Sequence, residues 1–381
     1  MGFRFKLTAL LLIVFISISK AQVSTYQKTD SITLSLFNAS EWQQLIDVGN
    51  EAISSGEDFS LLRLRMAYAA LVRQNYSEAL KHYDKVLETD KRNQTAVYYS
   101  YLCNIYLNRI EDAGYLASKL DTNIVEGERL NSFKLISAGL EGGVKFTNIY
   151  ERGNSVISRA FIDFQLNYKL NLSTSFTYFN QPVRDDNIAQ PGYYAKINYT
   201  PFRKINFVGA YHYMRSKLRQ LIYQNNVGLL GIRYADSGND LQGDVILSQI
   251  GDEQTRQYNI KFIKYITGNL NFYSTSRISF VDVLNNTNPV FQQTFGIKPI
   301  RNLWVEGVVT LGNQYNYAEA DALYIYNGFD KTKFKVGGNC YFLLKQHLLL
   351  GLNYTFERKS DNIFRFNYLQ HSINGGITWN F

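Results

Sequence analysis

Cysteine is scarce in this 381-residue chain, and long apolar runs are nearly absent. The two cysteines, Cys103 and Cys340, are far apart in the sequence and have no metal-ligating neighbours, which excludes a local disulfide framework and a cysteine metal site. We expect each to be a small buried or lipid-facing apolar side chain. Mean hydropathy is −0.23, and residues 1–21 form the one long apolar run, so a bundle of membrane-spanning helices is excluded too.

Patterns typical of an active site are also missing. His371 and Ser372 are adjacent and would point to opposite faces of a strand, so they cannot form a nucleophile–base pair. We expect the lone His212 to be an ordinary polar side chain rather than a catalytic group. No glycine-rich phosphate loop opens a helix, and no His/Cys/Asp cluster has metal-ligand spacing. The sequence therefore predicts a protein that is not an enzyme, with no cofactor and no metal.

Residues 1–21 are typical of a secretory signal peptide. Arg4 and Lys6 give a basic start, residues 7–18 form an apolar centre, and Ala21 completes a small-x-small cleavage site. The alternative, a retained membrane anchor, is disfavoured because the apolar centre is short. We expect export, with Gln22 opening the mature chain.

The last stretch, residues 364–381, alternates apolar and polar side chains from Leu369 onward, as a strand with one apolar face does. The chain ends on an aromatic residue, which suits the closing strand of a transmembrane barrel better than an exposed soluble edge. An ordinary sandwich strand is the alternative. The final eight residues also resemble the insertion signal of bacterial outer-membrane barrels, at Asn374, Gly376, Trp379 and Phe381.

Composition and periodicity predict an antiparallel barrel over residues 137–381. The chain holds 29 Tyr and 25 Phe, enough for the aromatic girdles of such a barrel. Successive period-two segments leave no room for crossover helices and give about 14 strands, with 12 to 16 open because residues 315–331 either add a strand or form one long loop. Tight turns alternate with longer connections such as 181–190 and 285–288, so short turns and both chain ends are expected in the periplasm.

Residues 40–136 have helical periodicity, with Ser40 as the expected N-cap of the first helix. Residues 60–93 resemble one tetratricopeptide (TPR) repeat, 94–120 a degenerate second one, and 123–136 a closing helix. Residues 22–39 are expected to be an irregular linker that either tethers the helices or reaches into the lumen. The helical region is either a spacer or a docking surface for a periplasmic protein. The predicted packing residues of the repeat are Met66, Ala67, Tyr76, Ala79, Tyr83 and Val86.

The basic excess of the chain lies in its second part. Residues 41–135 carry a net charge of −3, and residues 136–381 carry +8. For an exported barrel this favours lipopolysaccharide phosphates or an anionic solute as partner rather than nucleic acid. A lining whose charges pair with one another, without selectivity, is the alternative. Alternation along the strands predicts an inward-facing basic set, namely Lys196, Arg233, Lys261, Arg277, Lys333 and Lys335.

Together, these features resemble the YaiO-like outer-membrane proteins and, more distantly, barrel exporters of polysaccharides, which carry many more repeats. The resemblance implies a helical periplasmic region followed by an outer-membrane barrel, with lipid, lipopolysaccharide, the barrel-assembly machinery and a periplasmic protein as partners. Two functions remain open. One is a channel or exporter for an anionic solute or glycan, and the other is a non-conducting barrel that holds a periplasmic or envelope partner.

Overall fold

The computed structural model describes residues 26–284, 286–327, 330–361 and 366–381. The predicted signal peptide lies outside these residues. The chain divides into two compact units, one ending at Cys103 and one running from Asn104 to Phe381. This boundary falls well before residue 137, where the sequence placed the start of the barrel, because α6 (Ile110–Ala117) packs with the barrel.

The first unit is helical, with α2 (Trp42–Ser54), α3 (Ser60–Val72), α4 (Tyr76–Thr89) and most of α5 (Gln94–Tyr106). Residues 26–38 are helical too, so the prediction of an irregular linker is wrong for them. Leu36 and Phe37 bury their apolar side chains against Leu45 and its neighbours, which explains the ordered helix. Ser40 has a φ of 59° and lies outside α2, whose N-cap is Glu41, so Ser40 is not the predicted cap.

The helix pair α3/α4 buries the small residues that its close approach requires. Ala67 and Ala79 are fully buried, and Tyr83 stacks on Tyr99 of α5 with ring centroids 6.0 Å apart. Met66 and Val86 are buried as well, whereas Tyr76 is half-buried. Asn75 caps α4 by accepting a hydrogen bond from the Glu78 backbone N–H. Among the described helices, none is both long and apolar enough to cross a membrane.

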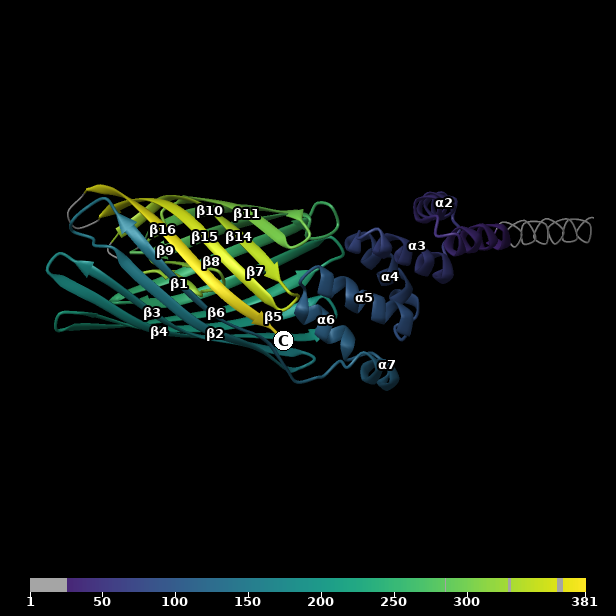
Figure 1. The fold of residues 1–381 in the computed structure, drawn as a ribbon, viewed down its shortest axis with the longest axis horizontal. Coiled ribbons are helices and arrows are strands. Elements are labelled where there is room, and N and C mark those ends of the chain that lie inside the picture. The colour runs from purple at the N-terminus through teal and green to yellow at the C-terminus, as the bar shows by residue number, and fades with distance from the viewer. Residues whose placement is uncertain (1–25, 285, 328–329, 362–365) are drawn as a thin grey trace, which may run out of the picture. The chain divides into compact units, whose positions relative to one another are not determined.

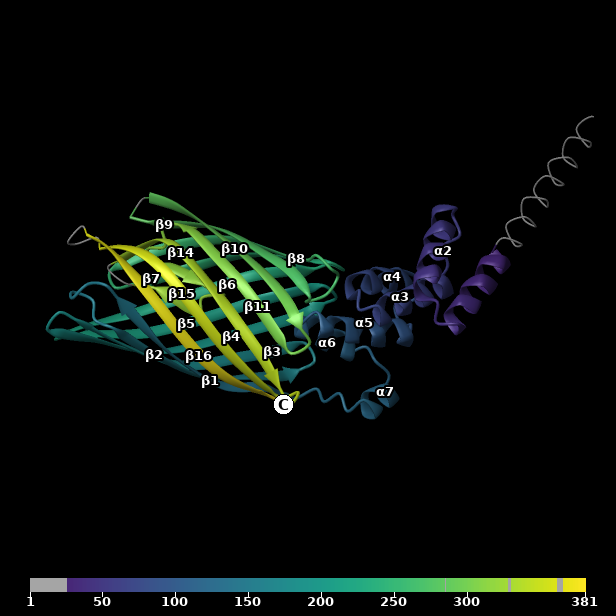
Figure 2. The ribbon, with the colours of Figure 1, turned by 45° about the horizontal axis from the view of Figure 1, so that its top comes forward.

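The second unit begins with α6 (Ile110–Ala117) and the short α7 (Thr122–Gly127). The expected closing helix over 123–136 is therefore wrong beyond Gly127, and β1 begins at Lys134. Fourteen antiparallel strands then form one closed barrel (Figures 1 and 2). They are β1 (Lys134–Thr147), β2 (Ser155–Asn167), β3 (Leu170–Val183), β4 (Asp186–Phe202), β5 (Ile205–Leu218), β6 (Leu221–Ala235), β7 (Asn239–Ile250), β8 (Glu253–Tyr265), β9 (Phe272–Val283), β10 (Asn286–Ile300), β11 (Leu303–Gly312), β14 (Asp330–Leu344), β15 (Leu348–Asp361) and β16 (Asn367–Asn380).

Closure of the barrel pairs the first strand with the last. Ser137 lies opposite Asn380, and the Phe381 N–H donates to the Ile136 carbonyl at 3.0 Å. The terminal strand therefore has a partner on each side, β1 and β15. This satisfies the backbone groups that an open sheet edge would leave unpaired, as a membrane-spanning sheet requires.

The barrel has an apolar exterior and a polar interior. Outward-pointing side chains stay exposed even when they are large and apolar, such as Leu230 at 76% and Leu352 at 57%. Their neighbours along the strands, such as Asn353, turn the other way and line the interior. A continuous exposed apolar surface of this kind is stable in lipid rather than in water, so the barrel spans a membrane.

Two predicted loops are shorter than expected. β3 reaches Val183 and β4 starts at Asp186, so most of 181–190 is strand, and β10 already starts at Asn286. Residues 313–327 match neither of the two structures predicted for this region, an added barrel strand or one long loop. They contribute no strand to the barrel wall, but β12 (Tyr317–Glu319) and β13 (Tyr324–Tyr326) pair with each other as a separate two-stranded sheet.

Candidate functional site: the barrel lumen

Residues 313–327, here called the inserted segment, fold back into the barrel between β11 and β14. Ala318 and Ala322 are buried against an apolar patch on the inner face of β5, β6 and β7. The Gln257 side chain donates to the Ala318 carbonyl at 2.8 Å and accepts from its N–H at 2.9 Å. This two-way contact fixes the segment to the wall as a strand neighbour would. The residues of the patch are Val208, Met214, Val227, Leu229 and Ile246.

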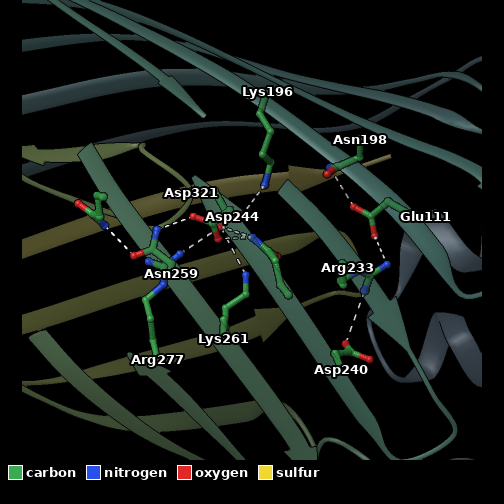
Figure 3. A network of polar contacts seen from close by, with 12 residues as sticks. Glu111, Lys196, Asn198, Arg233, Asp240, Asp244, Asn259, Lys261, Arg277 and Asp321 are labelled. Carbon is green, nitrogen blue, oxygen red and sulfur yellow. Dashed lines mark hydrogen bonds and ion pairs between the residues drawn. The ribbon is translucent and has the colours of Figure 1, made fainter. Parts of the chain in front are cut away.

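Asp321, at the tip of the inserted segment, meets three cations from three strands (Figure 3). Its Oδ1 lies 3.4 Å from Lys261 Nζ and 3.4 Å from Arg277 Nη2, and its Oδ2 lies 3.5 Å from Lys196 Nζ. The Gln242 side chain also donates to Oδ1, at 3.2 Å. Three of the predicted basic lumen residues are therefore brought together by a carboxylate that the sequence did not point to.

The backbone at this tip is in an unfavourable conformation. Ala320, Asp321 and Ala322 have φ values of 50°, 54° and 67°, a left-handed region that residues with a Cβ rarely adopt in succession. Two contacts to backbone carbonyls hold it. The Tyr194 hydroxyl donates to Asp321 O at 2.9 Å, and His212 Nδ1 lies 2.9 Å from Ala322 O. Contacts with the wall, rather than local preference, therefore determine the shape of the tip.

A second carboxylate of the inserted segment, that of Glu319, binds side chains of the nearby strands β10 and β14. Lys335 Nζ on β14 lies 2.5 Å from Glu319 Oε2 and 5.2 Å from the centroid of the Tyr326 ring. Gln292 on β10 donates to the same carboxylate. The segment is thus held by ion pairs to β4, β8, β9 and β14.

At the barrel end that carries Phe381, α6 contacts the strands through buried charges. Arg109, which immediately precedes α6, places Nη2 2.6 Å from Asp240 Oδ1 and lies 4.9 Å over the Tyr265 ring. Arg233 on β6 places Nη2 2.6 Å from Asp112 Oδ2 in α6. Burial raises the pKa of the Asp112 carboxyl, and the Arg233 charge opposes that rise. Figures 1 and 2 both show α6 beside this end of the barrel.

The close approach of α6 depends on Gly114. A Cβ built at this position would lie 2.4 Å from the carbonyl oxygen of Tyr168, in the β2–β3 turn. The Tyr168 hydroxyl in turn donates to the Leu130 carbonyl at 2.6 Å. A glycine in an otherwise helical segment is thus explained by contact with the barrel rim.

Beside the inserted segment the lumen retains a cavity of about 1110 Å³. Its far wall is formed by β14, β15, β16 and β1, where Gly337, Gly351 and Gly376 carry no side chain to fill the space. Seven basic and eight acidic residues line the cavity. The expected excess of positive charge is therefore absent, because Glu319 and Asp321 of the inserted segment and further acids of the strands and loops, such as Glu141 and Glu253, join the lining.

A chain of side-chain hydrogen bonds runs around this far wall. Asn374 donates to Asn353 at 2.9 Å, Asn353 donates to Asn339 at 2.6 Å, and Asn339 donates to Glu306 at 2.7 Å. The four residues lie opposite one another in the registers of β16, β15, β14 and β11. Tyrosines including Tyr324, Tyr341 and Tyr368 line the same space. The free surface of the cavity is thus rich in amide and phenol groups.

The remaining three predicted basic residues, Arg233, Lys335 and Lys333, differ in their surroundings. Arg233 contacts α6 and Lys335 contacts Glu319, as described above. Lys333 does not share the face of Lys335, which corrects the expectation that two residues two apart lie on one face. A β-bulge between Thr332 and Phe334 interrupts the alternation, and Lys333 is exposed and outside the cavity lining.

The residues of the predicted insertion signal divide between the two faces of β16. Trp379 and Phe381 are outside and exposed, at 48% and 64%. Asn374 and Gly376 line the cavity. A Cβ at Gly376 would lie 2.9 Å from Glu141 Cγ on the neighbouring strand β1. The signal therefore combines an apolar exterior with a closely packed interior.

Sequence reasoning missed the acidic partners Glu319 and Asp321 and the pair Arg109–Asp240. The sequence did contain one indication that Glu319 and Asp321 are not ordinary loop residues. The segment containing them combines two acids with small alanines and four tyrosines, a composition unusual for an exposed loop. For Arg109 and Asp240, distant in sequence, the chain carried no local signal.

No protein-family model matches this chain, and no curated protein does. Solved structures with similar architecture include the Acinetobacter baumannii outer membrane protein Omp33, at 8% identity and a TM-score of 0.41, covering 65% of this chain and 99% of that one. The CymD monoaromatic hydrocarbon channel has 8% identity and a TM-score of 0.46 over 68% and 93%. A bacterial polysaccharide outer membrane secretin has 9% identity and a TM-score of 0.41 over 65% and 98%. Likenesses this distant say nothing about function.

Proposed function

We propose that this protein is a bacterial outer-membrane channel whose solute path is the cavity between the inserted segment and the β14–β1 wall. The observation that supports this most directly is the reach of the cavity. Leu218 and Asp252 line it toward the end of the barrel away from α6, and Leu349 and Thr378 line it toward the end that carries Phe381. A polar space that extends along a membrane-spanning barrel offers solutes a route across the membrane.

The lining favours an uncharged polar solute, such as a sugar or a short glycan. Its seven basic and eight acidic residues nearly balance, so no fixed field concentrates ions of one sign. The amides of Asn339, Asn353 and Asn374 and the nearby tyrosine hydroxyls offer both donors and acceptors to solute hydroxyl groups. We therefore keep the glycan expected from the sequence and replace the anionic solute with an uncharged one.

Reconstitution of the purified protein in planar lipid bilayers tests the proposal. We expect a steady conductance with little selectivity, so that the reversal potential stays near zero in a potassium chloride gradient. A correctly folded barrel, identified by heat-modifiable migration, that remains silent in the bilayer would refute the channel. A strong anion preference would refute the assignment of an uncharged solute.

A non-conducting barrel that holds a partner is the second candidate. The buried ion pairs of α6 favour it, because Arg109–Asp240 and Arg233–Asp112 keep a helix at one mouth of the barrel. In both candidates we place the helical residues 26–103 in the periplasm, as a docking surface for a periplasmic protein. Lipid, lipopolysaccharide and the barrel-assembly machinery complete the proposed set of partners. The silent barrel described above is the outcome that selects this second function.

A further inference from the structure

We propose that Lys196, Lys261, Arg277 and Gln242 form a binding site for the carboxylate of a small solute, and that Asp321 occupies this site as an internal ligand. The four side chains come from β4, β8, β9 and β7 and converge on one carboxylate. Figure 3 shows the three cations around Asp321. The site is separate from the far wall of the cavity, where solutes are proposed to pass. Binding there does not depend on whether the barrel conducts.

The site is built from buried groups. Arg277 and Gln242 are each only 3% exposed. Nε of Arg277 has no hydrogen-bond acceptor among the residues that the structure describes, although a guanidinium offers five N–H donors in a fixed plane. A buried donor left without an acceptor is costly. Arg277 is therefore oriented for an anion that fits it better than Asp321 does.

Asp321 fits the site loosely. Its contacts with the three cations measure 3.4 to 3.5 Å, whereas a well-formed ion-paired hydrogen bond measures about 2.7–2.9 Å. The Glu319–Lys335 pair in the same segment, at 2.5 Å, shows how closely the segment can bind elsewhere. The unfavourable φ angles of residues 320–322 further oppose the bound position of the tip.

Positive charge also exceeds what Asp321 can neutralise. Three cations face the carboxylate of Asp321 and, at longer range, that of Asp244, which is hydrogen-bonded to the neutral amides of Gln242 and Asn259. One positive charge therefore remains in excess. Lys196, Lys261, Arg277 and Asp321 all line the cavity, so a solute that enters it reaches them. A carboxylate matches the observed donors, because Lys196 contacts one oxygen and the other three groups contact the second. A competing carboxylate would release the tip of the inserted segment from this wall.

The test is rescue of a vacated site by acetate. In Asp321→Ala the cations lose their internal partner, and acetate fills the vacancy. We expect 100 mM sodium acetate to raise the midpoint of heat-modifiable unfolding of the Asp321→Ala protein by several degrees relative to sodium chloride at the same ionic strength. Wild type should respond far less, because the tethered Asp321 has a high effective concentration.

Asp186→Ala is the matched control, since Asp186 pairs with Arg219 at the exposed end of the same barrel, 2.6 Å away. Its midpoint should not distinguish acetate from chloride. Should Asp321→Ala fail to assemble, Asp321→Gly also vacates the site, suits the φ of 54° at this position, and serves in the same comparison. Equal effects of acetate and chloride on the assembled Asp321 variant, or an equal acetate effect in Asp186→Ala, would overturn the site.

Discussion

Nη2 of Arg109 lies 2.6 Å from Oδ1 of Asp240, and both side chains are almost fully buried. Arg109 immediately precedes α6 and Asp240 is the second residue of β7, so this pair joins the helix to the barrel wall. The position of α6 against the barrel wall therefore depends on this pair more than on any surface contact.

Asp240→Asn should loosen α6. Removing one partner of a buried ion pair leaves an uncompensated charge and costs about 3–5 kcal/mol. Hydrogen exchange of the amides in residues 110–117 should become faster, while the exchange of β7 and β8 changes little. Asp236→Asn is the control, because the Asp236–Lys204 pair is partly exposed and should be worth about 1 kcal/mol at most. If the α6 amides were equally protected from hydrogen exchange in Asp240→Asn and wild type, the position of the helix would not depend on this pair.

Lys335 and Lys333 should respond differently to the same substitution. Lys335→Met leaves the buried Glu319 carboxylate without its closest cation and should destabilise the inserted segment by about 3–5 kcal/mol. Lys333→Met changes an exposed residue at a bulge and should alter stability by less than about 0.5 kcal/mol. Accessibility of an engineered cysteine at Tyr324 to a water-soluble maleimide measures release of the segment. Equal labelling in the two variants would contradict this assignment of faces.

Acid should weaken the helical unit through Glu78. A hydrogen bond from His82 lowers the pKa of the Glu78 carboxyl from its ordinary 4.5 to about 2. Because the folded-state pKa is the lower one, the stabilisation is fully present above pH 4.5 and is lost as pH falls from 4.5 towards 2. Thermal unfolding followed by circular dichroism should show that Glu78→Gln removes part of this acid sensitivity. Glu88→Gln, in an exposed pair with Lys85, is the control and should not.

Most of the barrel followed from periodicity alone. Fourteen strands were predicted because lipid and water impose opposite demands on alternate residues, which leaves a strong local signal. The interior was harder, since alternation tells which strand residues point inward but not what fills the space. Asp321 and Glu319 come from a connection without that alternation, and the bulge at Lys333 is one inserted residue that no pattern marks. Likewise, burial of Leu36 and Phe37, rather than helix propensity, orders residues 26–38.

The terminal aromatic residues should be needed for assembly. Trp379 and Phe381 are exposed on the outside of β16, where they contact lipid in a membrane. Replacing both with Ala should leave a protease-sensitive species that does not reach the outer membrane. Asn374→Ala instead removes an interior hydrogen bond to Asn353 and should permit assembly at a cost of about 1 kcal/mol. Normal heat-modifiable migration of the double variant from outer membranes would refute the predicted role.

Single-channel recording of wild type beside a variant with a shortened inserted segment tests the central claim most directly. Replacing residues 316–326 with a short Gly-Ser linker removes both carboxylates and the two small strands from the lumen while leaving the barrel wall intact. If the cavity beside the segment is the solute path, wild type should conduct steadily and the shortened variant should conduct several times more. Two silent proteins, each correctly folded in the bilayer, or two equal conductances, would contradict it.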